Sequence, residues 1–489
     1  MIPLSLAQIA AATGATPDRV ADPLLLVTGP VVIDSRDVTP GGLFAALPGE
    51  QVDGHDFAAF AVAAGAVAVL ASRPAGVPAL IVPDVPAALA RLAHALLGRL
   101  PAVTVAGITG SSGKTTAKDL LAQLAERLGP TVAPPGSFNN ELGHPLTVLR
   151  ADERTRYLVL ELGARGRGHI AELCKVAPPR LGAVLNVGRA HVGGYFADQA
   201  EVEQAKGELV EALPADGLAV LNADDPAVLR MQSRTDAAVT TFGRADSAQV
   251  RAVDVTLDAA GRPSFTLVTP GGAAPVRLNL RGGHNVSNAL AAAALAGGLG
   301  MATAEVAAAL SAAVARSKRR MDVTRRPDGV TVINDAYNAN PDSVRAALTA
   351  LRSIAGGGRA FAVLGHMAEL GGNSRAWHEE AGAFAARSGV AALIVVGDQA
   401  TPMLAGAKAE PGWQGELVHV PDAPSAVDAA VSRLGPGDTV LVKASRSEGL
   451  WRVAEALLAE PGPEPGPEPG PEPGPEPGLR EPPPPGAAR

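Results

Sequence analysis

The sequence contains one cysteine, few aromatic residues and no excess of positive charge. Cys174 has no second cysteine to pair with, so an intrachain disulfide is excluded. This fits a reducing compartment, and we expect a cytoplasmic protein. The chain has 42 Lys and Arg against 49 Asp and Glu, a net charge of −7. That balance does not provide the basic surface that nucleic-acid binding requires.

Long hydrophobic runs are also missing. The longest spans residues 57–71, is interrupted by Gly65, and is shorter than the roughly 20 residues that cross a bilayer. A buried helix followed by a strand explains it better. No basic residue precedes Arg19, so the charged front of a secretory signal is absent. We therefore expect neither stable membrane insertion nor export.

The sequence does contain an alternation of short apolar runs and helix-like segments, with Ala, Val and Leu in the hydrophobic positions. One series starts at residue 101 and a second near residue 330, and both have the βαβ rhythm of a parallel sheet. Residues 1–100 have strand and turn signals of their own. We predict an α/β protein of three domains: a small α/β domain (1–100), a central parallel-sheet domain (101–316) and a Rossmann-like domain (317–460).

Residues 461–489 have a different composition, with a repeated PGPE unit. This segment holds five Glu and two Arg, so it supplies −3 of the total charge and leaves −4 for the rest. Such a composition cannot bury enough apolar area to offset the entropy lost on ordering. We predict an extended, disordered tail without a catalytic role.

The most specific motif is a phosphate loop that lies between an apolar run and a helix-like run. It consists of Gly110, Ser111, Ser112, Gly113, Lys114, Thr115 and Thr116. The glycines let backbone N–H groups curl around phosphate oxygens, and the following helix adds positive potential. Lys114 can reach the β and γ phosphates of ATP, and Thr115 can ligate Mg²⁺. The spacing is the short GxxGKT form, and the alternative is an ordinary Gly/Ser turn.

Two further polar residues follow predicted strands, where a parallel sheet would bring them near the phosphate loop. Glu161 ends the apolar run that starts at Tyr157, and His191 follows the run at residues 181–188. A carboxylate at such an edge is a plausible Mg²⁺ ligand. A solvated glutamate and a packed or capping histidine are the alternatives.

Ten segments together resemble the Mur ligases, the ATP-dependent amide-forming enzymes of peptidoglycan precursor synthesis. They occur in the family's order between residues 34 and 446, and include TGSSGKTT (109–116), ELGARGRGHI (161–170), NVGRAHVGGY (186–195), GGHNVSNALAAAALA (282–296), NDAYNANPDS (334–343), LGHMAELG (364–371) and VLVKASR (440–446). The resemblance implies the three-domain architecture of this family, with a central phosphate-loop ATPase domain and, as in the family, a monomer.

The resemblance implies roles for individual residues at the nucleotide and metal. Glu161, His191 and Lys206 are similar to the ligands of a second Mg²⁺, with Lys206 carbamylated; an unmodified, solvated lysine is the alternative. His284, Asn285 and Asn288 are similar to adenine and ribose contacts, although they could instead cap a helix. Arg320 and Asp335 are similar to residues of the nucleotide site. Arg320 stands in the segment KRRM (318–321), which leaves open whether Arg319 or Arg320 faces the nucleotide.

The resemblance also implies substrate contacts. Ser35 and Arg36 are similar to the residues that hold the uridine diphosphate end of the acyl substrate. Lys443, Ser445 and Arg446 match the last motif and are expected near the incoming dipeptide or the tripeptide carboxylate, unless they are ordinary polar residues at a strand end. The remaining substrate contacts implied by the motifs are Asn139, Asn140, Tyr337 and Asn338.

The activity implied is the ATP-dependent joining of D-alanyl-D-alanine to UDP-N-acetylmuramoyl-tripeptide through an acyl phosphate. The motifs NDAYNANPDS and MAELG resemble those of the enzymes that add this dipeptide, and no DNPR-type motif for binding a diamino acid occurs. A ligase that adds the third residue of the peptide is the nearest alternative. A phosphate-loop switch or transport ATPase without ligase activity is the other. We also expect the carboxyl-terminal domain to close once ATP is bound.

Overall fold

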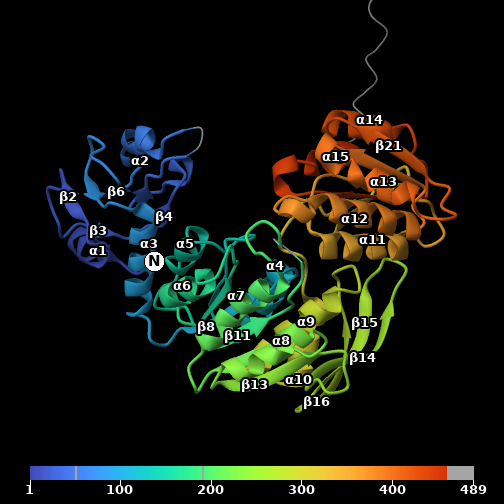
Figure 1. Cartoon of the computed structure of the whole chain (residues 1–489). Helices are drawn as coiled ribbons and strands as arrows, with labels where there is room; N and C mark the ends of the chain where they lie inside the picture. Colours follow the sequence, from blue (N-terminus) through green and yellow to red (C-terminus); the bar gives the residue numbers. More distant parts are fainter. Residues whose placement is uncertain (50–51, 190–191, 460–489) are drawn as a thin grey trace, which may run out of the picture.

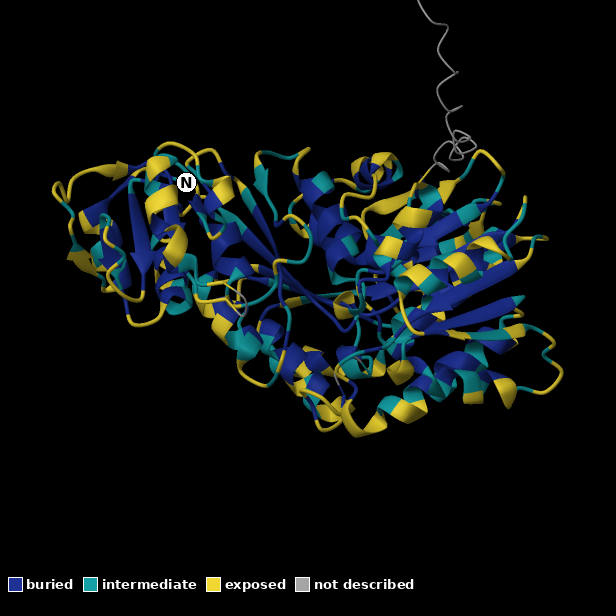
Figure 2. Cartoon of the chain, turned by 90° about the horizontal axis from the view of Figure 1, so that it is seen from above, coloured by how far each residue is buried: buried dark blue, intermediate teal, exposed yellow. Residues whose placement is uncertain are grey.

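The structure is a computed structural model that describes residues 1–49, 52–189 and 192–459. The chain forms three successive parts, with the amino-terminal and carboxyl-terminal parts on either side of the central part (Figure 1). The strands are buried inside each part, and the helices expose one face to solvent (Figure 2). The predicted tail lies outside the described residues.

The amino-terminal part contains a mostly parallel five-stranded sheet in the described residues. Its strand order is β2-β7-β6-β5-β4, with only β2 antiparallel to its neighbour, and a separate antiparallel pair, β1 and β3, lies beside it. The elements are β1 (Leu4–Ser5), α1 (Leu6–Thr13), β2 (Thr16–Asp18), β3 (Leu26–Val27), β4 (Val31–Val32), β5 (Leu43–Ala45), α2 (Ala58–Ala63), β6 (Ala68–Ala71), β7 (Ala79–Ile81) and α3 (Val85–Leu97).

The longest apolar run folds as the short helix α2 followed by strand β6. Strand β6 is fully buried, as expected. The prediction of a buried helix was wrong, because Phe60 in α2 is 56% exposed and Phe57 just before it is 40% exposed. Only Ala58 and Ala61 of α2 are buried. A six-residue helix on the edge of a small sheet cannot cover all of its side chains.

The central part is built on a nine-stranded sheet of order β16-β15-β14-β13-β12-β11-β8-β10-β9. The first seven strands in the chain run parallel, as predicted for this series. They are β8 (Thr104–Thr109), β9 (Thr131–Val132), β10 (Tyr157–Glu161), β11 (Leu181–Val184), β12 (Leu218–Asn222), β13 (Ala238–Gly243) and β14 (Val250–Leu257).

An antiparallel extension of this sheet was not predicted. Strands β15 (Pro263–Thr269) and β16 (Gly272–Arg277) add to β14 as a meander. In β15 the side chains of Phe265 and Leu267 are buried while their neighbours are not, which is the alternation of a sheet covered on one face. The central parallel strands β8, β10, β11 and β12 are buried at nearly every residue and lack this alternation.

Helices cover both faces of the central sheet. One face packs against α4 (Lys114–Ala125), α9 (Asn285–Gly298) and α10 (Thr303–Ala312). The other face packs against α5 (Gly143–Val148), α6 (His169–Val176) and α7 (Gln199–Glu211), and this core continues into α1 and α3 of the amino-terminal part. Helix α8 (Pro226–Arg230) follows β12.

The carboxyl-terminal part is a six-stranded sheet of order β17-β18-β22-β19-β20-β21, in which only β17 is antiparallel. Its strands are β17 (Asp322–Arg325), β18 (Thr331–Asn334), β19 (Ala360–Leu364), β20 (Ala392–Val396), β21 (Glu416–Val420) and β22 (Thr439–Lys443). Helices α11 (Pro341–Ala355), α12 (Ser374–Arg387) and α13 (Pro402–Lys408) cover one face, and α14 (Ala423–Val431) and α15 (Trp451–Leu458) cover the other. The predicted α/β fold class is confirmed.

A buried histidine makes the stability of the central part depend on pH. His144 in α5 is 0% exposed, and neither ring nitrogen has a hydrogen-bond partner of good geometry among the described residues. Burial lowers the pKa of His144 from 6.5 to about 4, and the main chain of Leu173 offsets only part of this effect. As the pH falls below 6.5, His144 therefore binds a proton in the unfolded chain but not in the folded chain, which destabilises the fold.

We expect the free energy of unfolding to fall by about 2 kcal/mol between pH 7 and pH 5, at about 1.4 kcal/mol per pKa unit. Urea denaturation of wild type and His144→Met at both pH values measures this, and the variant should lose the pH-dependent part. His94→Met is the matched control, since His94 is exposed on α3. Equal pH slopes for wild type and His144→Met would contradict the assignment.

Candidate active site

A cavity of about 920 Å³ lies where the central and carboxyl-terminal parts meet. It is lined by most of the residues that the sequence assigned to nucleotide, metal and substrate. These are Ser111, Ser112, Gly113, Lys114, Thr115, Thr116, Asn139, Asn140, Glu161, Lys206, His284, Asn285, Asn288, Arg320, Asp335, Tyr337, Asn338, Lys443, Ser445 and Arg446. Residues that are up to 335 positions apart in the chain therefore share one space.

The phosphate loop connects β8 directly to the first residue of α4, as its motif predicts. Gly113 has φ +82°, a conformation that side chains rarely adopt, and a Cβ there would lie 2.2 Å from Oδ1 of Asn288. Asn288 is 6% exposed on α9. Only glycine at this position allows α9 to pack against the loop.

Asn186, just after β11, holds the loop from the other side. Its side-chain oxygen accepts the N–H of Ser112 at 2.9 Å, and its amide donates to the Ser112 carbonyl at 3.2 Å. The N–H of Ser111 donates to the Asn186 carbonyl at 3.1 Å. The loop is therefore fixed in shape before any ligand binds, which reduces the entropy lost on binding.

Lys114 is the cation of the loop. Its ammonium donates to the Gly110 carbonyl at 2.7 Å, which directs the side chain back over the loop. Loss of contact with water lowers the pKa of Lys114, the Glu161 carboxylate opposes this effect, and Arg320 adds to it. Two cations and one carboxylate thus face the space where a phosphate chain would lie.

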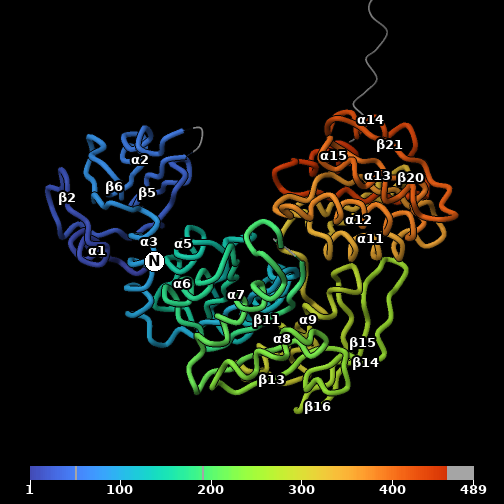
Figure 3. The backbone as a smooth tube through the Cα atoms, viewed as in Figure 1, coloured from blue at the N-terminus to red at the C-terminus, as the bar shows by residue number. Residues whose placement is uncertain are grey.

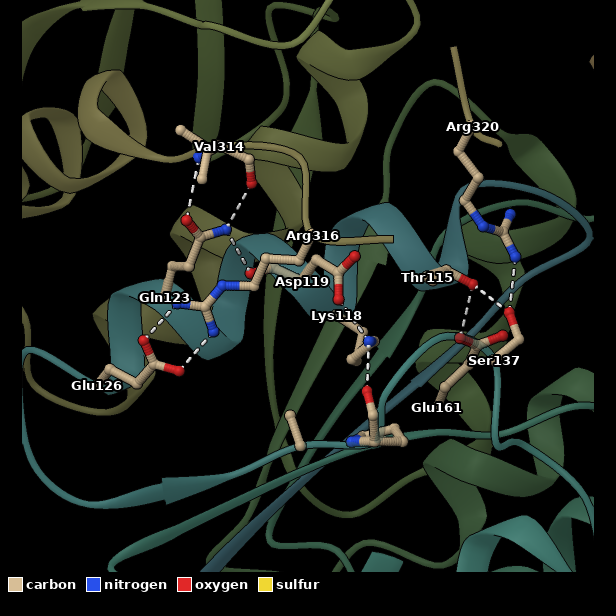
Figure 4. Close-up of polar contacts among 12 residues, drawn as sticks. Thr115, Lys118, Asp119, Gln123, Glu126, Ser137, Glu161, Val314, Arg316 and Arg320 are labelled. Carbon is tan, nitrogen blue, oxygen red and sulfur yellow. Dashed lines mark hydrogen bonds and ion pairs between the residues drawn. The ribbon is translucent and has the colours of Figure 1, made fainter. Parts of the chain in front are cut away.

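Thr115 and Glu161 form a polar cluster below the loop (Figure 4). The Thr115 hydroxyl donates to Glu161 Oε2 at 2.8 Å and lies 2.6 Å from the Ser137 hydroxyl, while Asn139 donates to Glu161 Oε1 at 2.7 Å. Glu161 is 1% exposed, so the alternative of a solvated strand-end glutamate is wrong.

These oxygen donors fit Mg²⁺. The described residues contain no group of three or more His, Cys, Asp or Glu that could enclose a metal. Mg²⁺ commonly binds through one or two carboxylates together with phosphate oxygens and water. A buried carboxylate next to a threonine hydroxyl at the phosphate loop suits that mode of binding.

Lys206, on α7, lines the same cavity. It is 4% exposed, so a solvated lysine is excluded. Burial lowers the pKa of Lys206 well below its ordinary value, and the nearby Lys114 lowers it further. A buried amine beside another cation favours the neutral, nucleophilic form. The carbamylation implied by the family resemblance remains a prediction.

His284, Asn285 and Asn288 lie at the start of α9, as the motif predicts. No side chain caps this helix; Asn285 instead donates to the Arg281 carbonyl at 2.7 Å, and Asn288 donates to Asn285 Oδ1 at 2.9 Å. The alternative role as a helix cap is therefore wrong. His284 is exposed toward the cavity, and its nucleotide contact remains a prediction.

Of the two adjacent arginines, Arg320 lines the cavity. Its guanidinium donates to the Ser137 hydroxyl at 2.6 Å and lies 4.1 Å from the centre of the Tyr337 ring. Arg319 pairs with Glu455 at 2.9 Å and stacks on Trp451. The geometry favours Arg320 as the residue that meets the nucleotide.

The segment that connects the two parts runs along α4 (Figure 4). Gln123 exchanges two hydrogen bonds with the main chain of Val314, at 2.9 and 3.0 Å. Arg316 makes a bidentate pair with Glu126 at 2.5 and 2.6 Å. The helix that begins at the phosphate loop therefore also anchors the linker to the carboxyl-terminal part.

Asp335 and Lys443 form a buried ion pair on the carboxyl-terminal side of the cavity. Lys443 is 3% exposed, and its ammonium donates to Asp335 Oδ2 at 2.7 Å and to the Asn338 carbonyl at 2.8 Å. These bonds hold the loop that carries Tyr337 and Asn338. The contact of Lys443 with substrate remains a prediction, and its ammonium already has protein partners.

Ser445 and Arg446 follow the same strand. Ser445 accepts the N–H of Ala368 at 2.8 Å, which ties this strand end to the loop after β19. Arg446 lies 5.7 Å from the centre of the Tyr337 ring, and Arg320 lies against the same ring. Tyr337 thus contacts two guanidinium groups that both line the cavity.

Three of the predicted residues that the structure describes, Ser35, Arg36 and Gly110, do not line this cavity. Ser35 is buried in the amino-terminal part and Arg36 is paired with Asp34 at 2.5 Å; neither lines the cavity. His191 lies outside the described residues. Gly110 is not on the cavity wall, although its carbonyl binds Lys114.

The two parts also touch beside the phosphate loop. Asp342, near the start of α11, accepts the N–H of Arg189 at 2.9 Å, and the N–H of Gly188 donates to Ser111 Oγ at 2.9 Å. The Arg189 guanidinium lies 4.5 Å from the centre of the Trp377 ring. These contacts join the carboxyl-terminal part to the segment that holds the phosphate loop.

Sequence reasoning missed Ser137, Asn186 and Asp342 as parts of the site. All three stand inside segments that resemble the family: SFNNELGHPLTVL, NVGRAHVGGY and NDAYNANPDS. Their positions within those motifs were the available signal. Which neighbour each one bonds follows only from the folded chain.

Comparison with known families agrees with this architecture. Residues 30–101 match the Mur ligase family, catalytic domain; residues 108–296 match the Mur ligase middle domain; and residues 319–446 match the Mur ligase, glutamate ligase domain. The fold and the site define an α/β ligase with a phosphate loop, and the chain belongs to the Mur ligase family.

Two relatives within this family carry the same name. The chain is 49% identical to the UDP-N-acetylmuramoyl-tripeptide--D-alanyl-D-alanine ligase of Mycobacterium tuberculosis, over 94% of this chain and 98% of the relative. It is 37% identical to the Escherichia coli protein of that name, over 87% and 93%. The recognition of the family is confirmed.

Solved structures give the same result. The crystal structure of MurF from Acinetobacter baumannii superposes with a TM-score of 0.83 at 30% identity, over 93% of this chain and 99% of that one. MurF from Thermotoga maritima in complex with ADP superposes with a TM-score of 0.76 at 30% identity, over 88% and 97%. In the described residues, none of the helices has both the length and the apolar composition needed to cross a bilayer.

Proposed function

We propose that the protein is a ligase that joins D-alanyl-D-alanine to UDP-N-acetylmuramoyl-tripeptide at the expense of ATP, in the cytoplasm. The observation that carries this proposal is the shared cavity, where the phosphate loop faces the motifs of the carboxyl-terminal part. The relatives that are 37% and 49% identical to this chain are named for this activity, and the similarity extends over nearly the whole chain.

The first step makes an acyl phosphate. A carboxylate does not condense with an amine at neutral pH, because its leaving group is poor. The terminal carboxylate of the tripeptide attacks the γ-phosphorus of ATP, and ADP leaves. Two anions meet in this step, and Lys114 and Arg320, which both line the cavity, offset their charge.

Thr115 and Glu161 would hold Mg²⁺ next to the phosphate loop. When bound there, this ion offsets the charge on the phosphate oxygens. Glu161 keeps the Thr115 hydroxyl oriented through their 2.8 Å hydrogen bond, and Asn139 fixes the other carboxylate oxygen. The protein groups are thereby aligned before the nucleotide arrives.

The second step forms the amide bond. The free amine of D-alanyl-D-alanine attacks the acyl carbon, and the tetrahedral intermediate loses phosphate. Arg446 and Tyr337 line the carboxyl-terminal wall, where a guanidinium can bind the carboxylate of the dipeptide. Three substrates must meet in one cavity, so docking of the two parts supplies much of the rate through proximity.

A glycine contact makes this docking testable. A Cβ at Gly194 would lie 2.5 Å from the Glu369 carbonyl oxygen and 3.0 Å from its carbon, and main-chain atoms cannot yield at low cost. We expect Gly194→Ala to lower the ligation rate at least tenfold while ATP affinity stays within about twofold, because the phosphate loop is intact.

Steady-state ligation and nucleotide titration of the same sample measure the two effects. Gly297→Ala is the matched control: Gly297 lies in α9 with no atom within 4 Å of its added Cβ, so its rate should be unchanged. Native ligation by the Gly194→Ala protein would show that docking of these two parts is not needed.

The proposed function is tested by ATP turnover with each substrate omitted in turn. Release of phosphate should require both the UDP-linked tripeptide and D-alanyl-D-alanine, and a new peptide bond should appear in equal amount. Turnover that depends on a free diamino acid and the UDP-linked dipeptide would indicate the third-residue ligase. Hydrolysis independent of any peptide would indicate a phosphate-loop ATPase.

A further inference from the structure

Two side chains on the cavity wall that can donate hydrogen bonds have no role in the mechanism above. Arg165 and His169 follow Glu161 in the chain, and both line the cavity that holds the phosphate loop. Arg165 lies in the loop after β10, and His169 is the first residue of α6. Their side chains are 53% and 21% exposed.

The pair already holds a carboxylate of the protein itself. Glu141 Oε1 lies 3.5 Å from Arg165 Nη1, and Glu141 Oε2 lies 3.3 Å from His169 Nε2. The Arg165 N–H donates to His169 Nδ1 at 3.1 Å. In the neutral ring the remaining nitrogen, Nε2, therefore carries the hydrogen and points it at the carboxylate.

The bond to Glu141 is weak enough to be exchanged. Both distances are long for an ion pair, and Glu141 is 54% exposed, so water screens the attraction. A ligand carboxylate that arrives through the cavity can take the same two donors. Glu141 would then return to solvent.

The position of the pair indicates which substrate supplies that carboxylate. Helices α5 and α6 lie between the amino-terminal part and α7 (Figure 3). The acyl substrate, held at its uridine diphosphate end by the amino-terminal part, must cross this region to reach Lys114. Arg165 is four residues from Glu161, so it lies close to the end of that path.

The acyl substrate has carboxylates to offer. One neighbouring structure, from Acinetobacter baumannii, has a title that describes a ligase for a chain of alanyl, D-glutamyl and 2,6-diaminopimelate residues. Glutamate and diaminopimelate each carry two carboxyl groups and use one in the amide bond. Such a peptide keeps one non-reacting carboxylate on each of these residues.

We propose that Arg165 and His169 bind a non-reacting carboxylate of the acyl-donor peptide and so place its reacting carboxylate at Lys114. This inference rests on the proposed function and adds the recognition of the peptide to it. The glutamyl and diaminopimelate residues are the two sources of this chemistry. Arg165 is a positioning and specificity residue, because it does not touch the reacting atoms.

The test compares KM values for two UDP-linked tripeptides, one ending in diaminopimelate and one ending in lysine. Arg165→Gln should raise the KM for the diaminopimelate peptide about tenfold or more, with KM for ATP and for D-alanyl-D-alanine unchanged. Glu141→Gln should lower the peptide KM, because the competing carboxylate is gone. Arg154→Gln, an 86% exposed arginine paired with Asp152, is the matched control.

The lysine peptide distinguishes the two sources. If the site binds the diaminopimelate carboxylate, Arg165→Gln leaves the KM for the lysine peptide unchanged; if it binds the glutamyl carboxylate, both KM values rise alike. Unchanged KM for both peptides, or an equal rise for all three substrates, overturns the inference. Absence of ligation by the wild type with either peptide would instead reject the proposed function.

Discussion

Replacing Lys114 with alanine is expected to lower the ligation rate at least about 10²- to 10³-fold, the usual effect of removing one donor at a developing anion. The reason lies in the first step, where a carboxylate approaches a phosphate that is already negative. Lys114 is held over the loop by the Gly110 carbonyl. Among the described residues, Lys206 is the one other lysine on the phosphate side of the cavity.

The measurement is phosphate release with all three substrates at saturating concentration. Lys408→Ala, a change at an exposed lysine of α13, is the control and should retain the native rate. The fold of the variant is checked by its thermal unfolding. Near-native phosphate release by the Lys114→Ala protein would mean that the loop does not handle the γ-phosphate.

Replacing Lys206 with alanine is expected to lower the ligation rate by about 10²-fold, and a short carboxylic acid in the assay should restore part of it. The lowered pKa of Lys206 favours the neutral amine, which is the form that adds to carbon dioxide to give a carbamate and a proton. The carbamate would place a carboxylate where the described chain has only an amine next to Lys114. Loss of that charge weakens metal binding.

Rescue separates this role from simple packing. Acetate or formate should raise the activity of Lys206→Ala and leave wild type unchanged, and Lys175→Ala, at a 71% exposed lysine, should need no rescue. Absence of rescue, together with density for an unmodified Lys206 in a crystal structure, would reject the carbamate. The lysine would then act by its own charge or by packing.

The phosphate loop was predictable from the sequence because its physics is local. Strand, glycine turn, lysine, threonine and helix follow one another without a break, and each residue type is needed for the backbone to wrap a phosphate. The βαβ rhythm of both larger sheets was predictable for a similar reason, since buried parallel strands are continuous apolar runs. The position of Glu161 near the phosphate loop was predictable because it ends such a run.

The partners of these residues were not predictable in the same way. Lys443 and Asp335 are 108 positions apart, and only the parallel pairing of β18 and β22 brings their strand ends together. The choice between Arg319 and Arg320 depends on the path of the linker along α4. The antiparallel strands β15 and β16 were not predicted, because they are only partly buried and their hydrophobic pattern is weaker than that of a buried strand.

The sequence alone thus determined the fold class, the phosphate loop and the family, because these depend on residue order over short stretches. The tertiary structure decided which carboxylate meets which cation, that Glu161 and Lys206 are buried, and that Arg165 and His169 share a wall with the phosphate site. Burial and pairing are properties of neighbours in space, and the packing of whole elements sets those neighbours.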